Sequence, residues 1–139
     1  MLFSKKELNF EVPKVMGIIN LTPDSFSDGG KFICPKTFKT DRSKVLKEIE
    51  EMENQGAAFI DIGAESTRPN AFQISAAEEL DRLMPILDDI KNINAVVSID
   101  SSKGEVISEA IKNGVDFIND INSLTVSYTH LTLPTIREV

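Results

Sequence analysis

The sequence contains a single cysteine and no long apolar run, and each of these two features excludes a class of protein. With Cys34 alone, neither an intrachain disulfide nor a cysteine-based zinc site can form, which favours a reducing compartment. No segment approaches the roughly 18 consecutive apolar residues of a membrane-spanning helix. Residues 1–11 alternate charged and apolar side chains and lack the apolar stretch of a signal peptide. The sequence therefore predicts a cytoplasmic protein that does not bind membranes.

Basic residues are also scarce, because 15 Lys and Arg stand against 22 Asp and Glu, for a net charge of -7. A nucleic-acid partner would need clustered Lys and Arg to neutralise its phosphates, so the composition argues against one. A small phosphate ester can still bind, because backbone N–H groups and one or two cations, including a metal ion, suffice. With 41% hydrophobic residues, the chain has enough apolar side chains for a globular core.

Four short apolar runs are predicted to be strands. They cover residues 15–20, 58–63, 95–100 and 115–120. Between them, apolar residues recur at helical spacing; the first two helices should begin near Asp41 and Ser75, and Asn113-Gly114 should end the third. The stripe of the second helix is Leu80, Leu83, Met84, Leu87 and Ile90. Pro85 should kink or split that helix. This alternation is typical of a parallel sheet covered by helices.

Polar residues occur within or at the end of every predicted strand. They are Asn20, Asp61, Asp100, Asn119 and Asp120. A β/α barrel builds its active site at the carboxyl ends of all its strands, whereas a doubly wound sheet binds a ligand at one switch point. The pattern therefore favours the barrel, although a complete barrel needs about 250 residues. We predict an α/β fold, a partial (β/α)8 TIM barrel over residues 1–125, with the first three β/α units and the fourth strand.

Four segments carry a family resemblance. They are MGIINLTPDSFSDGG (Met16–Gly30), FIDIGAESTRP (Phe59–Pro69), SIDS (Ser98–Ser101) and FINDI (Phe117–Ile121). In that order they resemble the two signature segments and the third and fourth strand ends of the dihydropteroate synthases. The agreement in order and spacing spans nearly the whole chain from Val15 to Leu124. The resemblance implies the N-terminal half of a pterin-binding barrel enzyme of folate biosynthesis, a family that sulfonamides target.

The resemblance also implies a transferase reaction. The (7,8-dihydropterin-6-yl)methyl group passes from its diphosphate to 4-aminobenzoate, which gives 7,8-dihydropteroate and diphosphate. Diphosphate leaves with the help of Mg²⁺, and the aromatic amine attacks the resulting cation, so electrostatic stabilisation carries the step. The family further implies a homodimer whose interface lies in the second half of the barrel, and a fragment that is inactive on its own.

The first strand end and its loop supply three candidates. Without the family, Asn20 would be an amide that caps a turn; by resemblance it is a ligand of Mg²⁺ bound to the substrate's diphosphate. Mg²⁺ prefers oxygen ligands and shares them with substrate phosphates, so one amide oxygen is adequate. By resemblance Phe26 contacts the aminobenzoate ring, and Asp28 is the catalytic carboxylate near the carbon that becomes cationic. The alternative for this loop is a polar turn cluster.

The later strand ends supply the other candidates. By resemblance Thr67 binds the diphosphate, Arg68 is a catalytic residue of the same loop, and Pro69 contacts the second substrate. Hydroxyl and guanidinium groups both suit phosphate oxygens, although a surface arginine is more often a solvated charge. Asp100 and Asn119 would line the pterin pocket by resemblance. Their alternative is a mutual hydrogen bond, because a polar side chain at a buried strand end needs a partner.

Two other functions remain open at this point. A corrinoid-type methyltransferase shares the pterin pocket, but it is not expected to carry the TPDSFSDGG loop. A non-catalytic pterin-binding module is the second alternative. Asp61 is predicted only as a structural hydrogen-bonding residue near the barrel mouth.

The sequence departs from the family in three places. Ala64 and Asn70 stand where the family more often has glycine. After Leu124 or Thr125 the sequence no longer fits the family, and residues 126–135 match one reading frame of transposon-end sequencing adapters. We therefore predict that residues 126–139 are a non-native, adapter-derived tail. His130 lies in this tail and is given no role.

Overall fold

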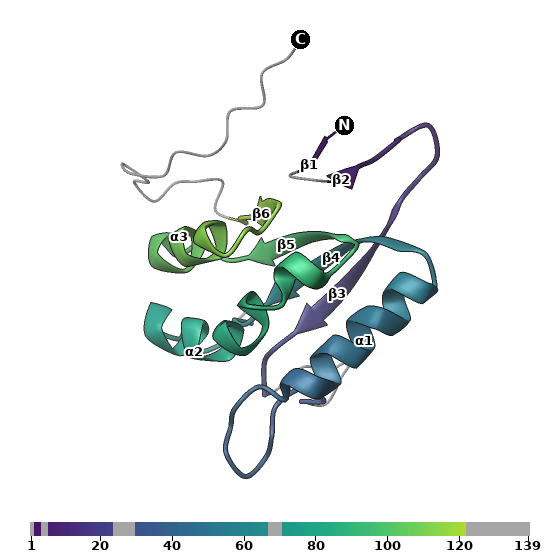
Figure 1. Ribbon diagram of the computed structural model, residues 1–139. Helices are drawn as coiled ribbons and strands as arrows, with labels where there is room; N and C mark the ends of the chain where they lie inside the picture. The colour runs from purple at the N-terminus through teal and green to yellow at the C-terminus, as the bar shows by residue number, and fades with distance from the viewer. Residues whose placement is uncertain (1, 4–5, 24–29, 67–70, 122–139) are drawn as a thin grey trace.

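The computed structural model describes residues 2–3, 6–23, 30–66 and 71–121. An antiparallel pair, β1 (Leu2–Phe3) and β2 (Lys6–Glu7), precedes a four-stranded parallel sheet (Figure 1). The sheet strands, in spatial order, are β3 (Val15–Asn20), β4 (Ala57–Gly63), β5 (Val96–Asp100) and β6 (Phe117–Asn119). This confirms the predicted α/β class, with a fourth strand shorter than the predicted 115–120.

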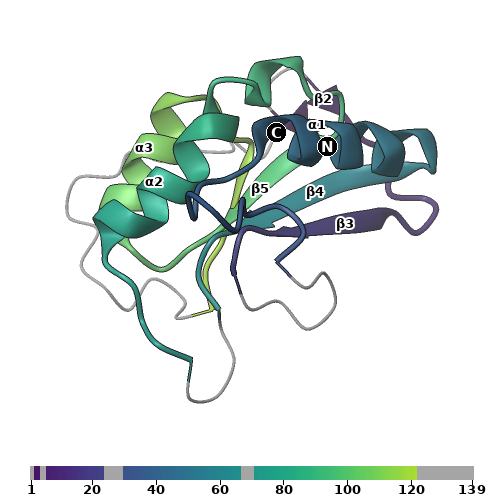
Figure 2. The same ribbon diagram turned by 90° about the horizontal axis from the view of Figure 1, so that it is seen from below.

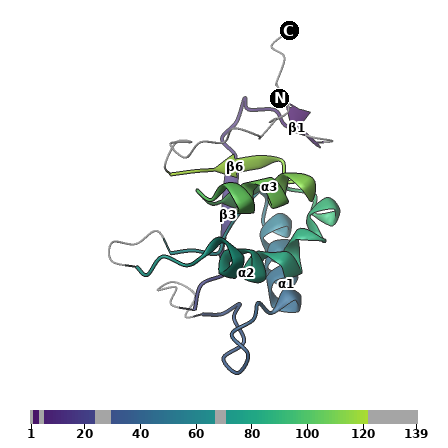
Figure 3. The ribbon, with the colours of Figure 1, turned by 90° about the vertical axis from the view of Figure 1, so that its left-hand side faces the viewer.

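The helices lie on one side of this sheet, as Figure 2 shows. They are α1 (Arg42–Asn54), α2 (Ala76–Leu87) and α3 (Gly104–Lys112). α2 contacts both α1 and α3 (Figure 3). None of the described helices is long and apolar enough to cross a bilayer.

The helix ends follow the capping rules from which they were predicted. The Asp41 carboxylate accepts the Lys44 N–H at 3.2 Å, and the Ser75 hydroxyl accepts the Glu78 N–H at 3.1 Å, so each satisfies a free backbone donor of the first turn. Gly114 follows α3 with a φ of 87°, a conformation that glycine adopts without strain. Pro85 lies inside α2, which continues to Leu87, and the short 3-10 helix η1 (Ile90–Asn92) follows. The predicted helix is thus divided two residues after Pro85.

The buried face of α2 differs from the predicted apolar stripe. Met84 is 40% exposed, whereas Glu79 is fully buried together with Leu83 and Leu87. Residues 79, 83 and 87 are spaced by four and therefore share one face of the helix. Met84 follows Leu83 directly, and consecutive residues of a helix point in different directions, so the Met84 side chain points away from that face. A carboxylate thus occupies a core position of this helix.

The two faces of the sheet have different environments. The face toward the helices is apolar and fully buried at Ile19, Ile60 and Ile99. On the other face, which would be the inside of a closed barrel, Ile18 is 57% exposed and Phe117 is 48% exposed. The described residues therefore bury one face of the sheet and leave apolar side chains of the other in solvent.

We predict that the 139-residue chain alone binds the dye ANS and self-associates, because this open face and the two sheet edges attract other apolar surfaces. Ile18→Thr should reduce both effects, and Ile19→Thr on the buried face should increase them. ANS fluorescence and light scattering test this. The control is the completed barrel, defined as residues 1–121 joined to the second half of a barrel of the family that the sequence resembles. The prediction is contradicted if the chain is monodisperse, melts cooperatively and does not bind ANS.

Candidate active site

The carboxyl ends of the four parallel strands form one polar row. The sheet register pairs Asn20 with Gly63, Gly63 with Asp100, and Asp100 with Asn119. Side chains at one register level of a parallel sheet point to the same face. The structure therefore brings three sequence-predicted residues together, on the face opposite the helices. Gly63 contributes no side chain, so the row is open between Asn20 and Asp100.

A second polar level lies two residues before the row, on the same face. Asp61 pairs with Ser98 there, and both are buried. The Asn119 amide donates a hydrogen bond of 3.2 Å to Asp61 Oδ2. The partner of Asn119 is thus Asp61, not Asp100 as the structural alternative from the sequence would have it.

Two atoms at this level are unpaired in the described part of the chain. Asp61 Oδ1 and Ser98 Oγ are buried without a hydrogen-bond partner there. A buried polar atom without a partner destabilises a fold by about 1 to 3 kcal/mol. Retaining two of them beside the strand-end row is typical of a site whose ligand supplies the missing partners. The hydrogen bond from Asn119 confirms the prediction that Asp61 is a structural hydrogen-bonding residue. Ser98 was not singled out from the sequence, although its position two residues before Asp100 assigns it to the same face.

Asp100 supplies the carboxyl group of the row, and the pKa of this group is raised. Loss of hydration on burial raises the pKa of Asp100 to about 6, and the negative charges of Asp61, Glu79, Asp120 and Glu65 contribute in that order. Its ordinary value is 3.8. A strongly shifted carboxyl group among other polar groups at a strand end is a candidate functional group.

Asn20 is the predicted metal ligand. No hydrogen bond joins its side chain to another described residue. Within residues 6–23, 30–66 and 71–121 there is no group of three His, Cys, Asp or Glu that could hold a metal ion. The described residues therefore form no complete metal site, and Asn20 could supply one oxygen ligand to an ion that takes its other ligands from water and phosphate.

Five candidates from the sequence cannot be placed. Phe26, Asp28, Thr67, Arg68 and Pro69 lie outside the described residues. Their roles stay predictions.

A charged cluster near the row was not predicted. Lys103 Nζ donates to Glu65 Oε2 and to Glu79 Oε2, each at 2.6 Å. Burial lowers the pKa of Lys103, but the hydrogen bonds to Glu65 and Glu79 outweigh it and raise the pKa above its ordinary value. The ammonium therefore stays charged. The signal in the sequence was Glu79, four residues before Leu83 on the apolar face of a helix.

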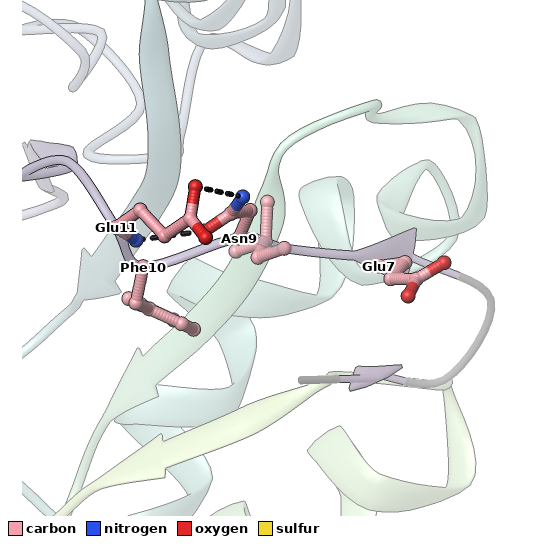
Figure 4. Close-up of a pocket in the computed structure, with 5 residues that line it drawn as sticks. Glu7, Asn9, Phe10 and Glu11 are labelled. Atoms are coloured by element: carbon pink, nitrogen blue, oxygen red, sulfur yellow. Dashed lines mark hydrogen bonds between the residues drawn. The ribbon is translucent and has the colours of Figure 1, made fainter.

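A surface pocket lies at the opposite end of the strands and is a weaker candidate. It is lined by residues 7–11, where Asn9 and Glu11 hydrogen-bond to each other (Figure 4). The Phe10 ring lies 6.1 Å from that of Phe59, near the start of β4. The pocket contains none of the predicted site residues.

Comparison with known proteins identifies relatives over most of the chain. Residues 16–138 match the family described as pterin binding enzyme. The dihydropteroate synthase of Haemophilus influenzae is 48% identical over 122 residues, which are 87% of this chain and 42% of that protein. The chain thus spans less than half the length of this relative. The family match extends into residues 126–139, so a non-native tail remains only a prediction.

Comparison with solved structures identifies relatives of the same family. The Yersinia pestis dihydropteroate synthase in complex with a sulfonamide drug superposes with a TM-score of 0.82 and 40% identity, over 92% of this chain and 44% of that one. The Burkholderia cenocepacia dihydropteroate synthase complexed with 7,8-dihydropteroate gives a TM-score of 0.72 and 36% identity, over 89% and 38%. These neighbours are TIM barrels, so the described sheet is the N-terminal part of that fold.

We predict that Asp100→Asn stabilises the completed barrel at pH 7.5 and not at pH 4. The folded state binds the Asp100 proton more tightly than the unfolded state, so stability falls as the pH rises from 3.8 to about 6. The gain above pH 6 should be at most about 1 kcal/mol, because solvent screens a half-exposed group. Urea unfolding at both pH values measures it. The exposed Asp81→Asn, as a control, should change stability by less than about 0.5 kcal/mol; an equal gain at pH 4 and 7.5 contradicts the interpretation.

Proposed function

The chain belongs to the pterin-binding enzyme family, and from this we propose that it forms the first half of a dihydropteroate synthase barrel. The reaction joins (7,8-dihydropterin-6-yl)methyl diphosphate to 4-aminobenzoate and releases diphosphate. The observation that carries the proposal is the row of Asn20, Gly63, Asp100 and Asn119 along the carboxyl edge of the sheet. A relative whose structure superposes on this sheet was solved with 7,8-dihydropteroate, the product of this reaction.

Asp100 and Asn119 supply the pterin contacts in this proposal. A carboxylate accepts hydrogen bonds from ring N–H groups, and an amide both donates and accepts. The hydrogen bond to Asp61 orients the Asn119 side chain and uses its NH2 group. The side-chain amide oxygen of Asn119 is left for the ligand. A pterin that donates to Asp100 would favour the charged form of this carboxylate and so lower its raised pKa.

Asn20 and the two loops act on the diphosphate and on the second substrate. Asn20 would hold Mg²⁺ through its amide oxygen, and the ion would neutralise charge on the leaving diphosphate. Thr67 binds the diphosphate and Arg68 stabilises its charge. Phe26 and Pro69 contact the aminobenzoate, and Asp28 stabilises the positive charge that develops on the methylene carbon.

The remaining properties follow from the same family. We propose a cytoplasmic homodimer whose interface lies in the second half of the barrel. No specific observation favours a corrinoid-type methyltransferase or a non-catalytic module over the synthase.

The direct test is turnover by the completed barrel, with its second half taken from the Haemophilus influenzae relative. We expect diphosphate release that depends on both the pterin diphosphate and 4-aminobenzoate, and that stops when Mg²⁺ is chelated. The 139-residue chain alone should be inactive, because half of the barrel mouth is missing. A properly folded completed barrel that binds pterin but never releases diphosphate would exclude the synthase and leave the methyltransferase and the binding module as alternatives.

A second prediction separates the two carboxylates Asp100 and Asp28. Asp100→Asn places an amide donor where a ring N–H points, and unmet partners are worth about 1 to 3 kcal/mol, so pterin diphosphate affinity should fall by roughly ten- to hundredfold. Asp28→Asn should leave that affinity nearly unchanged and lower kcat, because its interaction forms only as charge develops. Calorimetry and steady-state kinetics on the completed barrel measure both effects. The reverse pattern would show that the two roles are wrongly assigned.

A further inference from the structure

Three charged residues outside the strand-end row join three separate parts of the chain. Lys103 follows β5 and immediately precedes α3, Glu65 follows β4, and Glu79 lies on α2. The Lys103 ammonium binds one oxygen of each carboxylate at 2.6 Å. One cation thereby links the segment after β4 to the segment after β5.

Packing alone does not account for this cluster. The Glu79 side chain is fully buried, those of Lys103 and Glu65 are 20% and 21% exposed, and Glu79 Oε1 has no partner within the described ranges. Removing charges from water offsets most of their attraction, so a buried ion pair is often no more stabilising than an apolar pair of similar volume. α2 does place apolar residues at its other core positions.

Glu65 connects the cluster to both ends of the segment that follows β4. Its second oxygen, Oε1, accepts the Ile74 N–H at 2.9 Å, so residues 65 and 74 are held together. The residue before it is fixed from α2, since Arg82 Nη1 donates to the Ala64 carbonyl at 2.9 Å. Between these ends lie Thr67 and Arg68, the proposed diphosphate-binding residues.

Lys103 connects the same cluster to the pterin side of the site. It stands three residues after Asp100, and its backbone N–H donates to the Ser101 hydroxyl at 3.2 Å. The Ser101 N–H in turn donates to the Asn119 carbonyl at 3.1 Å. The chain from Asp100 to Lys103 is thus held against β6, and the ammonium is held in a fixed place.

We propose that Lys103 is a positioning residue that, through Glu65, fixes both ends of the Glu65–Ile74 segment relative to Asp100. Both described ends of this segment are thereby held in a fixed place relative to the pterin-binding edge. The inference rests on the proposed function, because it takes Thr67 and Arg68 as diphosphate ligands.

The decisive variant is the double substitution Lys103→Met with Glu79→Leu in the completed barrel. It removes the buried charge pair as a unit, so no buried carboxylate is left unpaired and the fold is retained, while Glu65 loses its anchor. Glu65→Gln is the second variant, because it leaves the Lys103–Glu79 pair intact. Lys112→Met is the matched control, since Lys112 forms an exposed ion pair with Glu109 on the same helix.

Two measurements separate positioning from stability. Hydrogen exchange at the Ile74 amide reports the loop ends directly, and we expect it to be about tenfold faster in both test variants. Displacement of reacting groups by about 1 Å can cost a hundredfold in rate, so kcat should fall by roughly ten- to hundredfold. The affinity of the test variants for the dihydropterin that lacks the diphosphate group should stay within about twofold of the parent's affinity for it. Lys103→Arg should restore most of the rate, because a guanidinium can bind both carboxylates.

Unchanged hydrogen exchange at Ile74 would overturn the inference. So would an equal loss of affinity for the pterin with and without its diphosphate, or a double variant that keeps the parent's kcat. Failure of this inference can be told apart from failure of the proposed function. If the parent completed barrel shows no turnover, the function fails, and the positioning role is then decided by Ile74 exchange together with the ratio of the two pterin affinities.

Discussion

The site depends on one constraint, the hydrogen-bond register of a parallel sheet whose strands have two unlike faces. Burial of Ile19, Ile60 and Ile99 against the helices fixes which residues face the other way. A slip of one residue in any strand would turn its apolar set toward solvent, so the register is strongly specified. The level of Asn20, Asp100 and Asn119 then follows without further interactions. The helix-covered core therefore positions polar groups that it does not contact.

The same constraint concentrates negative charge. Asp61 and Asp100 lie on adjacent strands and the same face, and Glu65 and Glu79 are close enough to raise the pKa of Asp100 further. Like charges this close disfavour the ionisation of Asp100. Within the described ranges Lys103 is the cation that contacts two of these carboxylates. The carboxyl edge of the sheet thus holds a destabilising concentration of negative charge, which is typical of candidate functional sites.

Much of the fold could be predicted from the sequence because its signals are local. Strand positions follow from apolar runs, and the caps at Asp41 and Ser75 follow from side chains that reach three residues ahead. The row was predictable too, because strand ends of a parallel sheet meet at one edge. The cluster of Glu65, Glu79 and Lys103 was not, because its members are distant in the sequence and only tertiary packing shows that a glutamate occupies a core position of α2. The exposure of Met84 has the same origin.

The spatial order of the parallel strands is also their order in the chain. Each new strand can therefore pair with the one made before it, and the helix-covered core can form on the ribosome while later strands are still being synthesised. During that interval Ile18 and Phe117 on the opposite face remain exposed to solvent. At ordinary translation speed the rest of a barrel takes on the order of ten seconds to emerge. For that time the exposed apolar side chains of the inner face can associate with other chains, so aggregation competes with completion of the barrel.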